Sequence, residues 1–563
     1  MAEIGEYLEM EGVPFKPRAY EKAAQAVGDL DKTLSELYQS GGLPALEEIP
    51  GVGASIAKKI GELLKTGRLK YYDLLKKKVP VDLSALGKIE GLGPKSIKKL
   101  YEELGVKTVA DLEKAARAGK IAALEHFGAK SEENIKKGLD FLKKSTGRFL
   151  LGAALPKARK IEHRLHELKG VERVIAAGSL RRRKETIGDL DILVVSKKPK
   201  PVMNFFVGMP EVVRVFAHGE TKSAVKLDSG LDVDLRVVPA ESYGAALNYF
   251  TGSKDHNVAL RELAMSLGYK LNEYGLFKGK KQIAGRTEED LYAELGMDYI
   301  EPELRENTGE IELAKKHKLP KLIGYDDLQG DLQIQTDWTD GSDSIEAFAQ
   351  AAIKRRLAYI AITDDTKRLA MTGGLDEKKI RRQWAEVDRV QKKIGSRLKI
   401  LKGTECDILK DGSLDLDDET LSQLDVVGVA VHSHFDLPRE EQTKRIIRAI
   451  KNPNVDILFH PTGRLIGKRE AYDLDMEAVI QAAKETGTIL EIDAFPDRLD
   501  LKYEYVRKCV AAGVKLSIDT DAHSIAHLDF LEYGIAQARR GWAEKSDVVN
   551  TRPLEAFLKQ LKK

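Results

Sequence analysis

The stretch between Gly178 and Asp191 holds the residue types and spacing best suited to chemistry in this sequence. Asp189 and Asp191 stand two apart at the start of an apolar run, and strand side chains alternate, so both carboxylates face the same side. A third carboxylate is expected on a neighbouring strand, and the run 231–238 supplies Asp234. Carboxylate oxygens are the ligands that Mg²⁺ prefers, with water and substrate phosphate completing its coordination. The three aspartates therefore predict a site for two Mg²⁺ (or Mn²⁺) ions.

The residues before the aspartates are suited to a nucleoside triphosphate. Gly178 and Ser179 permit a phosphate chain to approach the backbone closely, and Arg182 can neutralise its charge. A site of this kind would join a 3′-hydroxyl to the nucleotide and release pyrophosphate. The alternative is that Asp189 and Asp191 are surface residues at a strand edge. The Gly-Ser pair and the second acidic strand favour the catalytic interpretation.

A glycine pattern repeats in the first part of the chain. It reads apolar-x-Gly-x-Gly at 49–53 and again at 89–93, and a degenerate third copy follows at 125–128. A helix follows each copy, as in a helix–hairpin–helix, where backbone N–H groups at the helix start hold a DNA phosphate without reading sequence. One copy alone could be an ordinary helix cap, but repetition favours nucleic-acid binding. The expected DNA-binding glycines are Gly51, Gly53, Gly91 and Gly93.

Apolar patterning predicts the elements that position these residues. The region 1–145 reads as helical, and a mixed α/β texture begins near 146. Beyond residue 330, strand-like runs alternate with helical stretches, which is typical of parallel strands with crossover helices. The expected strands are 174–177, 191–195, 212–216 and 231–238, then 359–363, 398–401, 426–431, 457–459, 489–492 and 515–518.

Composition limits the class of protein. At 563 residues, 42% hydrophobic and 32% charged, the chain should form several globular domains. A net charge of +3 implies that any phosphate-binding surface is local. The apolar runs are too short to span a bilayer, and the acidic start lacks the apolar region of a secretory signal. Two widely separated cysteines, Cys406 and Cys509, favour a reducing environment, so we expect a cytoplasmic protein without a membrane partner.

The motifs at 178–191, 233–238 and 249–253 resemble those of family X DNA polymerases, and the resemblance covers about residues 1–315. It implies a DNA polymerase that fills short gaps in base excision repair, with gapped or primer–template DNA and dNTPs as partners, acting as a monomer. Asp189, Asp191 and Asp234 would be the metal ligands, and Asp234 would accept the 3′-hydroxyl proton. The implied nucleotide contacts are Gly178, Ser179, Arg182, Gly188, Tyr249, Phe250, Gly252 and Asn257.

The resemblance implies further roles for which the residues alone allow an alternative. Tyr249 and Phe250 would exclude a ribose 2′-hydroxyl, although two aromatics could equally pack in a core. Arg261 would contact the template strand. Lys59 stands where repair members carry a lysine that removes a 5′-deoxyribose phosphate through a Schiff base. Ser55 replaces a lysine common in active lyases, so phosphate binding is the alternative role for Lys59.

The region 326–563 resembles the polymerase and histidinol phosphatase (PHP) domain found in bacterial and archaeal enzymes of this family. The resemblance implies a distorted (β/α)₇ barrel with a trinuclear metal cluster at its strand ends. Three expected histidines are replaced, by Gln333, Gln335 and Asp365, and a glutamine oxygen is a poor ligand beside imidazole. We therefore expect the nuclease to be lost or weak, and leave the metal content open. The vestigial metal ligands would be Asp340, Glu405, His432, His460, Asp521 and His523.

The expected order of domains combines these readings. It comprises a small N-terminal DNA-binding domain at 1–78, fingers at 79–145, an α/β nucleotidyltransferase palm at 146–240, a thumb at 241–315, a linker at 316–330 and a PHP barrel at 331–563. One alternative makes the barrel a 3′–5′ exonuclease or AP endonuclease as a second activity. Another is a silent DNA-binding scaffold, and a third is an untemplated transferase, against which Asn257 and Arg261 speak.

Overall fold

The computed structural model describes residues 1–28, 30, 33–89, 92–145, 147–369 and 372–562. The expected helical N-terminal region is confirmed. Its apolar residues, among them Tyr7, Leu46 and Leu100, form one continuous core. The helices are α1 (Ala2–Met10), α2 (Lys16–Gly28), α3 (Leu34–Glu47), α4 (Ala54–Thr66), α5 (Lys70–Lys78), α6 (Leu83–Leu86), α7 (Pro94–Leu104), α8 (Val109–Arg117) and α9 (Ala129–Ser145).

A mixed five-stranded sheet forms the palm, in the order β2-β4-β7-β6-β5. Strands β4 and β7 are parallel, and the other neighbours are antiparallel. Alternating apolar residues of β4, such as Leu190 and Ile192, pack in one core with α10 and α12. The elements are β1 (Phe149–Leu150), α10 (Leu151–His166), β2 (Val171–Ala176), α11 (Gly178–Arg181), β3 (Thr186–Ile187), β4 (Asp189–Ser196), α12 (Pro199–Val207), β5 (Val212–His218), β6 (Lys222–Leu227) and β7 (Asp232–Val238).

The thumb packs its helices on a small antiparallel sheet of order β10-β9-β8. A buried polar network links them: His256 contacts Glu310 at 2.7 Å through Nδ1 and the Tyr292 hydroxyl at 3.0 Å through Nε2. The elements are α13 (Tyr243–Thr251), α14 (Lys254–Ser266), β8 (Lys270–Asn272), β9 (Gly275–Lys278), β10 (Lys281–Ala284), α15 (Glu288–Glu294) and α16 (Glu310–Lys315).

Seven parallel strands in the order β11 to β17 form the C-terminal barrel. A parallel bridge between Ile334 and Ala522 joins the segments that follow the first and last strands, so the sheet nearly closes. Strand β12 is buried at every position, as expected for parallel strands covered on both sides. The strands are β11 (Gly330–Asp331), β12 (Tyr359–Ile362), β13 (Lys399–Asp407), β14 (Val426–Ala430), β15 (Ile457–Leu458), β16 (Ile489–Asp493) and β17 (Leu516–Asp519).

Helices cover the outside of the barrel, which confirms the alternation predicted from the sequence. Ile323, within the predicted linker, is fully buried in the barrel core. The helices are α17 (Ile345–Lys354), α18 (Glu377–Ile394), α19 (Asp418–Leu421), α20 (Arg439–Ile450), α21 (Met476–Thr486), α22 (Tyr503–Ala512), α23 (Leu531–Arg540) and α24 (Leu554–Leu558).

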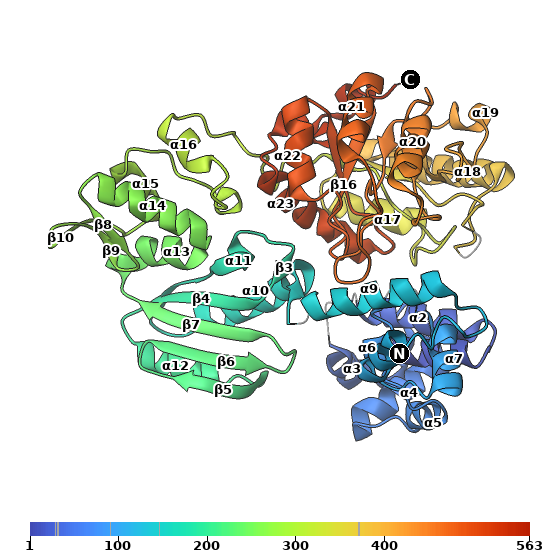
Figure 1. The fold of residues 1–563 in the computed structure, drawn as a ribbon, viewed down its shortest axis with the longest axis horizontal. Helices are drawn as coiled ribbons and strands as arrows, with labels where there is room; N and C mark the ends of the chain where they lie inside the picture. Colours follow the sequence, from blue (N-terminus) through green and yellow to red (C-terminus); the bar gives the residue numbers. More distant parts are fainter. Residues whose placement is uncertain (29, 31–32, 90–91, 146, 370–371, 563) are drawn as a thin grey trace.

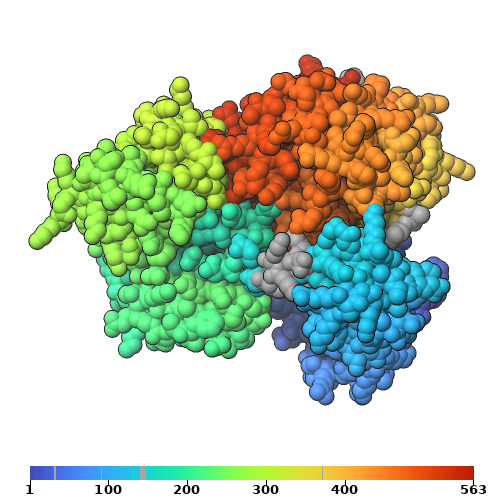
Figure 2. All heavy atoms as spheres, viewed as in Figure 1, coloured from blue at the N-terminus to red at the C-terminus, as the bar shows by residue number. Residues whose placement is uncertain are grey.

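The barrel lies beside both the palm and the N-terminal helices, and the thumb lies on the side of the palm away from the N-terminal helices (Figures 1 and 2). Arg159 of α10 forms a bidentate pair with Glu532 of α23, at 2.8 and 2.6 Å. Arg464 pairs with Glu185 at 2.8 Å. These ion pairs hold the barrel against the palm. Within the described part of the chain, no helix combines the length and apolar character needed to cross a bilayer.

Candidate active site and barrel centre

Three carboxylates meet where β4 and β7 run side by side. Asp191 pairs in register with Asp234, and Asp189 pairs with Asp232. Burial raises the pKa of Asp191 to about 6, and the charges of Asp189 and Asp234 add to this rise. Asp234 also contacts Lys222 on β6 at 3.2 Å. The structure thus brings the three predicted aspartates together, and their mutual repulsion is the kind that a divalent cation relieves.

Gly178 fits tightly against one of these carboxylates. Its φ of +61° lies in the left-handed region, and a Cβ added there would stand 2.6 Å from Oδ2 of Asp191. Any side chain at this position would push the carboxylate aside. A glycine is therefore required both by the backbone conformation and by the close approach.

A cleft of about 560 Å³ opens in front of the aspartates. Its walls contain all eight nucleotide contacts expected from the sequence, together with Arg261 and two of the predicted metal ligands, Asp189 and Asp191. The eight are Gly178, Ser179, Arg182, Gly188, Tyr249, Phe250, Gly252 and Asn257. Asp234 is not among the lining residues. Arg148, Lys184 and Lys254 also line the cleft, and sequence reasoning missed them. Lys184 lies within the motif at 178–191 and Lys254 follows the motif at 249–253, but only the fold brings Arg148 to the site.

The aromatic pair at the end of α13 borders the cleft. The rings of Tyr249 and Phe250 meet edge to face at 5.1 Å, and Asn257 donates to the carbonyl of Tyr249 at 2.7 Å. The guanidinium of Arg236 stands 4.6 Å from the centre of the Phe250 ring. Tyr249 is 37% exposed, which is more than a core aromatic would show.

Two adjacent arginines tie the palm to the thumb. Arg181 forms a bidentate pair with Glu288 of α15, at 2.9 and 2.6 Å. Arg182 places its Nε 3.2 Å from Glu306 and donates to the carbonyl of Thr251. Arg182 therefore lines the cleft while its Nε lies beside a thumb carboxylate.

The glycine hairpins place helix starts at the surface of the N-terminal region. Gly51 has φ +77°, and Gly53 and Gly93 are the residues immediately before α4 and α7. Neither helix start is capped by a side chain, and a Cβ at Gly53 or Gly93 would meet nothing within 4 Å. The backbone N–H groups there are open to an approaching anion. Gly91 lies outside the described residues.

Lys59 lies on α4 between two tyrosines. Its Nζ is 5.0 Å from the Tyr71 ring centre and 5.8 Å from that of Tyr20. It donates to the Ser55 hydroxyl at 2.9 Å. The lysine is thus held on an aromatic surface by the residue that replaces an expected lysine, and the ring faces stabilise the charged amine that phosphate binding requires.

At the barrel centre, Glu405 is surrounded by the residues that replace histidines and by two remaining imidazoles. Gln333 and Gln335 both donate to its Oε2, at 2.8 and 2.7 Å. His460 and His432 contact its Oε1 through Nε2, at 2.7 and 3.0 Å. Both glutamines therefore point at one position, as their spacing predicts. Their amide N–H groups stabilise the negative charge of Glu405, as a bound cation would.

Asp365 adjoins this cluster, because a parallel β-bridge pairs it with Glu405. Its backbone N–H donates to Gln335 Oε1 at 3.2 Å. Burial raises the pKa of Asp365 well above its ordinary value, and the charge of Glu405 adds to the effect. The negative charge of Asp365 would repel that of Glu405, whereas a neutral imidazole at this position could bind a metal ion without that repulsion.

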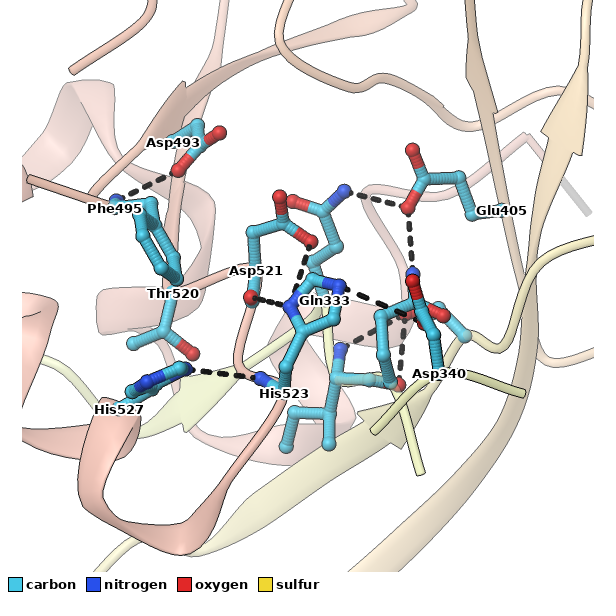
Figure 3. Close-up of polar contacts among 12 residues, drawn as sticks. Gln333, Asp340, Glu405, Asp493, Phe495, Thr520, Asp521, His523 and His527 are labelled. Atoms are coloured by element: carbon cyan, nitrogen blue, oxygen red, sulfur yellow. Dashed lines mark hydrogen bonds and ion pairs between the residues drawn. The ribbon is translucent and has the colours of Figure 1, made fainter. Parts of the chain in front are cut away.

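The other expected vestigial metal ligands, Asp340, Asp521 and His523, form a second group (Figure 3). Nε2 of His523 lies 3.6 Å from Asp340, and its Nδ1 lies 3.8 Å from Asp521. Arg498 contacts Asp521 at 3.4 Å and Asp493 at 3.3 Å. Sequence reasoning missed Arg498 and Asp493. Asp493 ends the predicted strand 489–492, where a polar residue at a strand end could have been noticed, whereas nothing local marks Arg498.

The palm site and the barrel centre differ in the number and type of ligand atoms that they offer to metal ions. Three crowded carboxylates in the palm suit hard divalent cations such as Mg²⁺. In the barrel, ligand atoms of Glu405, His432 and His460 lie within 4.8 Å of one another and could hold one ion. The amide N–H groups on the other oxygen of Glu405 cannot ligate a cation. Among the described residues, the barrel centre does not fit a three-metal cluster.

Comparisons with known proteins agree with this geometry. Family models match residues 1–69 (helix–hairpin–helix domain), 83–140 (SAM-like helix–hairpin–helix tandem) and 246–306 (DNA polymerase beta thumb). The tandem match at 83–140 covers both the second glycine copy and the degenerate third copy.

Curated relatives extend the match beyond single domains. The chain is 39% identical to the DNA polymerase/3′–5′ exonuclease PolX of Bacillus subtilis, over 99% of this chain and 98% of the relative. It is 26% identical to DNA polymerase lambda of Rattus norvegicus, over 53% of each chain. A probable phosphatase of Thermoanaerobacter is 32% identical over 30% of this chain and 70% of its own.

The helix–hairpin–helix region, palm and thumb define a DNA-directed DNA polymerase that carries a C-terminal PHP barrel. More particularly, the chain belongs to the family X DNA polymerases of the bacterial PolX type.

The fit between Gly178 and Asp191 predicts a specific loss of activity. Gly178→Ala should lower kcat for primer extension by about a hundred-fold, because the new methyl group displaces the carboxylate by the order of an ångström. Steady-state primer extension measures the effect. Gly230→Ala is the matched control: Gly230 also has positive φ (+85°), but an added Cβ would stand 3.7 Å from its nearest neighbour, Phe149. Equal rates for the two variants would contradict the steric argument.

Proposed function

We propose that this polymerase fills short gaps in DNA during base excision repair by templated nucleotidyl transfer, with Asp189, Asp191 and Asp234 as metal ligands. The observation that carries the proposal is the meeting of these carboxylates on two paired strands, where Asp189 and Asp191 line a cleft that is also lined by cations. Two Mg²⁺ (or Mn²⁺) ions, when bound there, would supply charge neutralisation and activation of the 3′-hydroxyl. Monomeric action belongs to the same proposal.

The chain's own residues would orient the reactants. Gly178 and Ser179 would admit the triphosphate close to the backbone, and Arg182 would bind its charge. Asp234 would accept the proton of the 3′-hydroxyl. Asn257, held by the carbonyl of Tyr249 at 2.7 Å, would contact the incoming base.

Sugar and template recognition would come from the thumb side of the cleft. The edge-to-face contact between Tyr249 and Phe250 keeps both rings in fixed positions, so a ribose 2′-hydroxyl would collide with them. Arg261, on the same wall of the cleft, would contact the template strand. This arrangement supports a templated reaction with deoxynucleotides rather than an untemplated one.

Preference for gaps follows from the hairpins. The starts of α4 and α7 would each bind DNA phosphates, so separate contacts could grip the strand beyond a gap while the palm holds the primer end. Lys59 would bind the 5′-phosphate on the far side of the gap. A Schiff-base lyase role for this lysine is the second candidate, but it requires the neutral amine, and the two tyrosine rings stabilise the charged one.

We also propose that the barrel has little or no nuclease activity. The Bacillus relative is named as a polymerase and a 3′–5′ exonuclease. In this chain, however, Gln333 and Gln335 satisfy Glu405 with amide hydrogens, and at most one ion would bind weakly. Phosphoester hydrolysis by such a centre requires metals that acidify a water and clamp the phosphate.

The catalytic assignment predicts a separation of chemistry from binding. Asp189→Ala and Asp234→Ala should each slow single-turnover nucleotide addition by several orders of magnitude, because the metal site acts on the transition state. DNA affinity should stay within a few-fold of wild type, because the hairpins hold the DNA. Asp232→Ala is the control, since Asp232 lies on the same strand but pairs with Lys226 at 2.6 Å. Near wild-type rates in the Asp189→Ala/Asp234→Ala double variant would sink the assignment.

The gap preference can be measured by fluorescence anisotropy. DNA with a one-nucleotide gap and a 5′-phosphate should bind more tightly than open primer–template, and both affinities should fall steeply with salt. Gly53→Leu should weaken binding, because the side chain fits the fold but occupies the space of a phosphate. Gly28→Leu is the control, since an added Cβ there also meets nothing within 4 Å. Equal affinity for the two DNAs at every salt concentration would count against gap recognition.

The barrel proposal predicts a gain from restored ligands. The triple variant Gln333→His, Gln335→His and Asp365→His should hold more metal than wild type, as measured by elemental analysis after dialysis against Mn²⁺. Wild-type protein should show little 3′–5′ exonuclease activity with Mn²⁺. Strong exonuclease activity that survives Asp189→Ala and disappears with His460→Ala would overturn this view of the barrel.

A further inference from the structure

A barrel arginine reaches the wall of the polymerase cleft. Arg540, the last residue of α23, has a fully buried side chain. Its guanidinium donates to the backbone carbonyl of Arg182 at 2.7 Å and to Glu306 Oε1 at 3.1 Å. It also lies over the ring of Tyr503, 4.4 Å from the ring centre. The barrel thus touches the main chain of a residue that lines the nucleotide cleft.

Glu306 is the shared partner at this junction of palm, thumb and barrel. It receives Arg182 Nε at 3.2 Å, Arg540 at 3.1 Å and Lys184 Nζ at 3.6 Å. Burial would raise the pKa of Glu306, but the three cations outweigh it, Arg540 most strongly, and hold that pKa below its ordinary value. Glu306 is therefore a carboxylate for which two cleft cations and one barrel cation compete.

An incoming triphosphate would compete with Glu306 for two cations of the cleft. The phosphate chain must draw Arg182 and Lys184 toward itself, and both are engaged with Glu306. Arg540 supplies Glu306 with a counter-charge that never leaves the junction, because its side chain is buried. Without Arg540, the carboxylate would bind Arg182 more tightly, and the carbonyl of Arg182 would lose a donor.

We propose that Arg540 is a positioning residue for nucleotide binding: it neutralises Glu306 and fixes the backbone of Arg182, so that Arg182 stays available to the triphosphate. The inference rests on the proposed role of Arg182 as a triphosphate contact. In this role the barrel would support nucleotide binding in the polymerase cleft without a metal ion of its own. Part of the nucleotide cleft is then built by a residue 358 positions away in the chain.

The neighbouring arginine separates this role from simple packing. Arg539 leaves the same helix and is also buried, but it pairs with Glu303 at 2.7 Å and with Glu301 at 3.3 Å. It donates to the carbonyl of Ile323 at 2.8 Å. These partners lie outside the set of residues that line the cleft. Arg539 therefore joins thumb and barrel without touching Arg182.

The test is nucleotide kinetics on gapped DNA with the full-length protein. Arg540→Gln should raise KM for the correct dNTP by about ten-fold and change kcat much less, as expected for one charge-assisted contact. Adding Glu306→Gln should restore KM to within about three-fold of wild type, because it removes the competing carboxylate. Arg539→Gln should leave KM unchanged while lowering the melting temperature at least as much.

Other results would contradict the proposal or its premise. If Arg540→Gln and Arg539→Gln shift KM equally, or if Glu306→Gln fails to rescue, Arg540 serves only packing and the inference is wrong. If Arg182→Ala leaves KM unchanged, the proposed role of Arg182 fails first. Should Arg540→Gln not fold, Arg540→Lys replaces it. That variant should show a smaller rise in KM that Glu306→Gln also reverses, and no rise would overturn the proposal.

Discussion

Electrostatic repulsion among three aspartates is the constraint on which the rest of the structure depends. Asp191 and Asp234 face each other across paired strands, and Asp189 stands beside them. The pKa of Asp191 rises to about 6 through burial and through its two neighbours. Folding alone does not favour such crowding. The sheet fixes the three carboxylates in place, and the charges of Arg236 on β7 and Lys222 on β6 offset part of the repulsion.

Much of the palm could be predicted because its information is local. A period of two places Asp189 and Asp191 on one face, and Gly178 precedes them at a spacing that brings it against Asp191. The hairpin glycines and the alternating strands of the barrel are likewise readable from short windows. Even the convergence of Gln333 and Gln335 on one acceptor follows from their spacing.

What could not be predicted depends on tertiary contacts between distant segments. Arg148 joins the cleft only because β1 pairs with β3. Arg498 reaches Asp521 across the barrel mouth, and Arg540 reaches Arg182 across a domain boundary. None of these arginines stands in a pattern, since a long side chain that ends in a charge looks the same whether it is solvated or buried in an ion pair.

In the proposed mechanism the palm binds the catalytic metal ions and the barrel has a structural part, because amides and imidazoles already satisfy Glu405. The most direct measurement is anomalous scattering from crystals of the full chain grown with gapped DNA, a non-hydrolysable nucleotide and Mn²⁺. The account predicts strong Mn²⁺ peaks beside Asp189, Asp191 and Asp234, and at most one weak peak beside Glu405. A cluster of strong peaks in the barrel, with none between the palm aspartates, would contradict it.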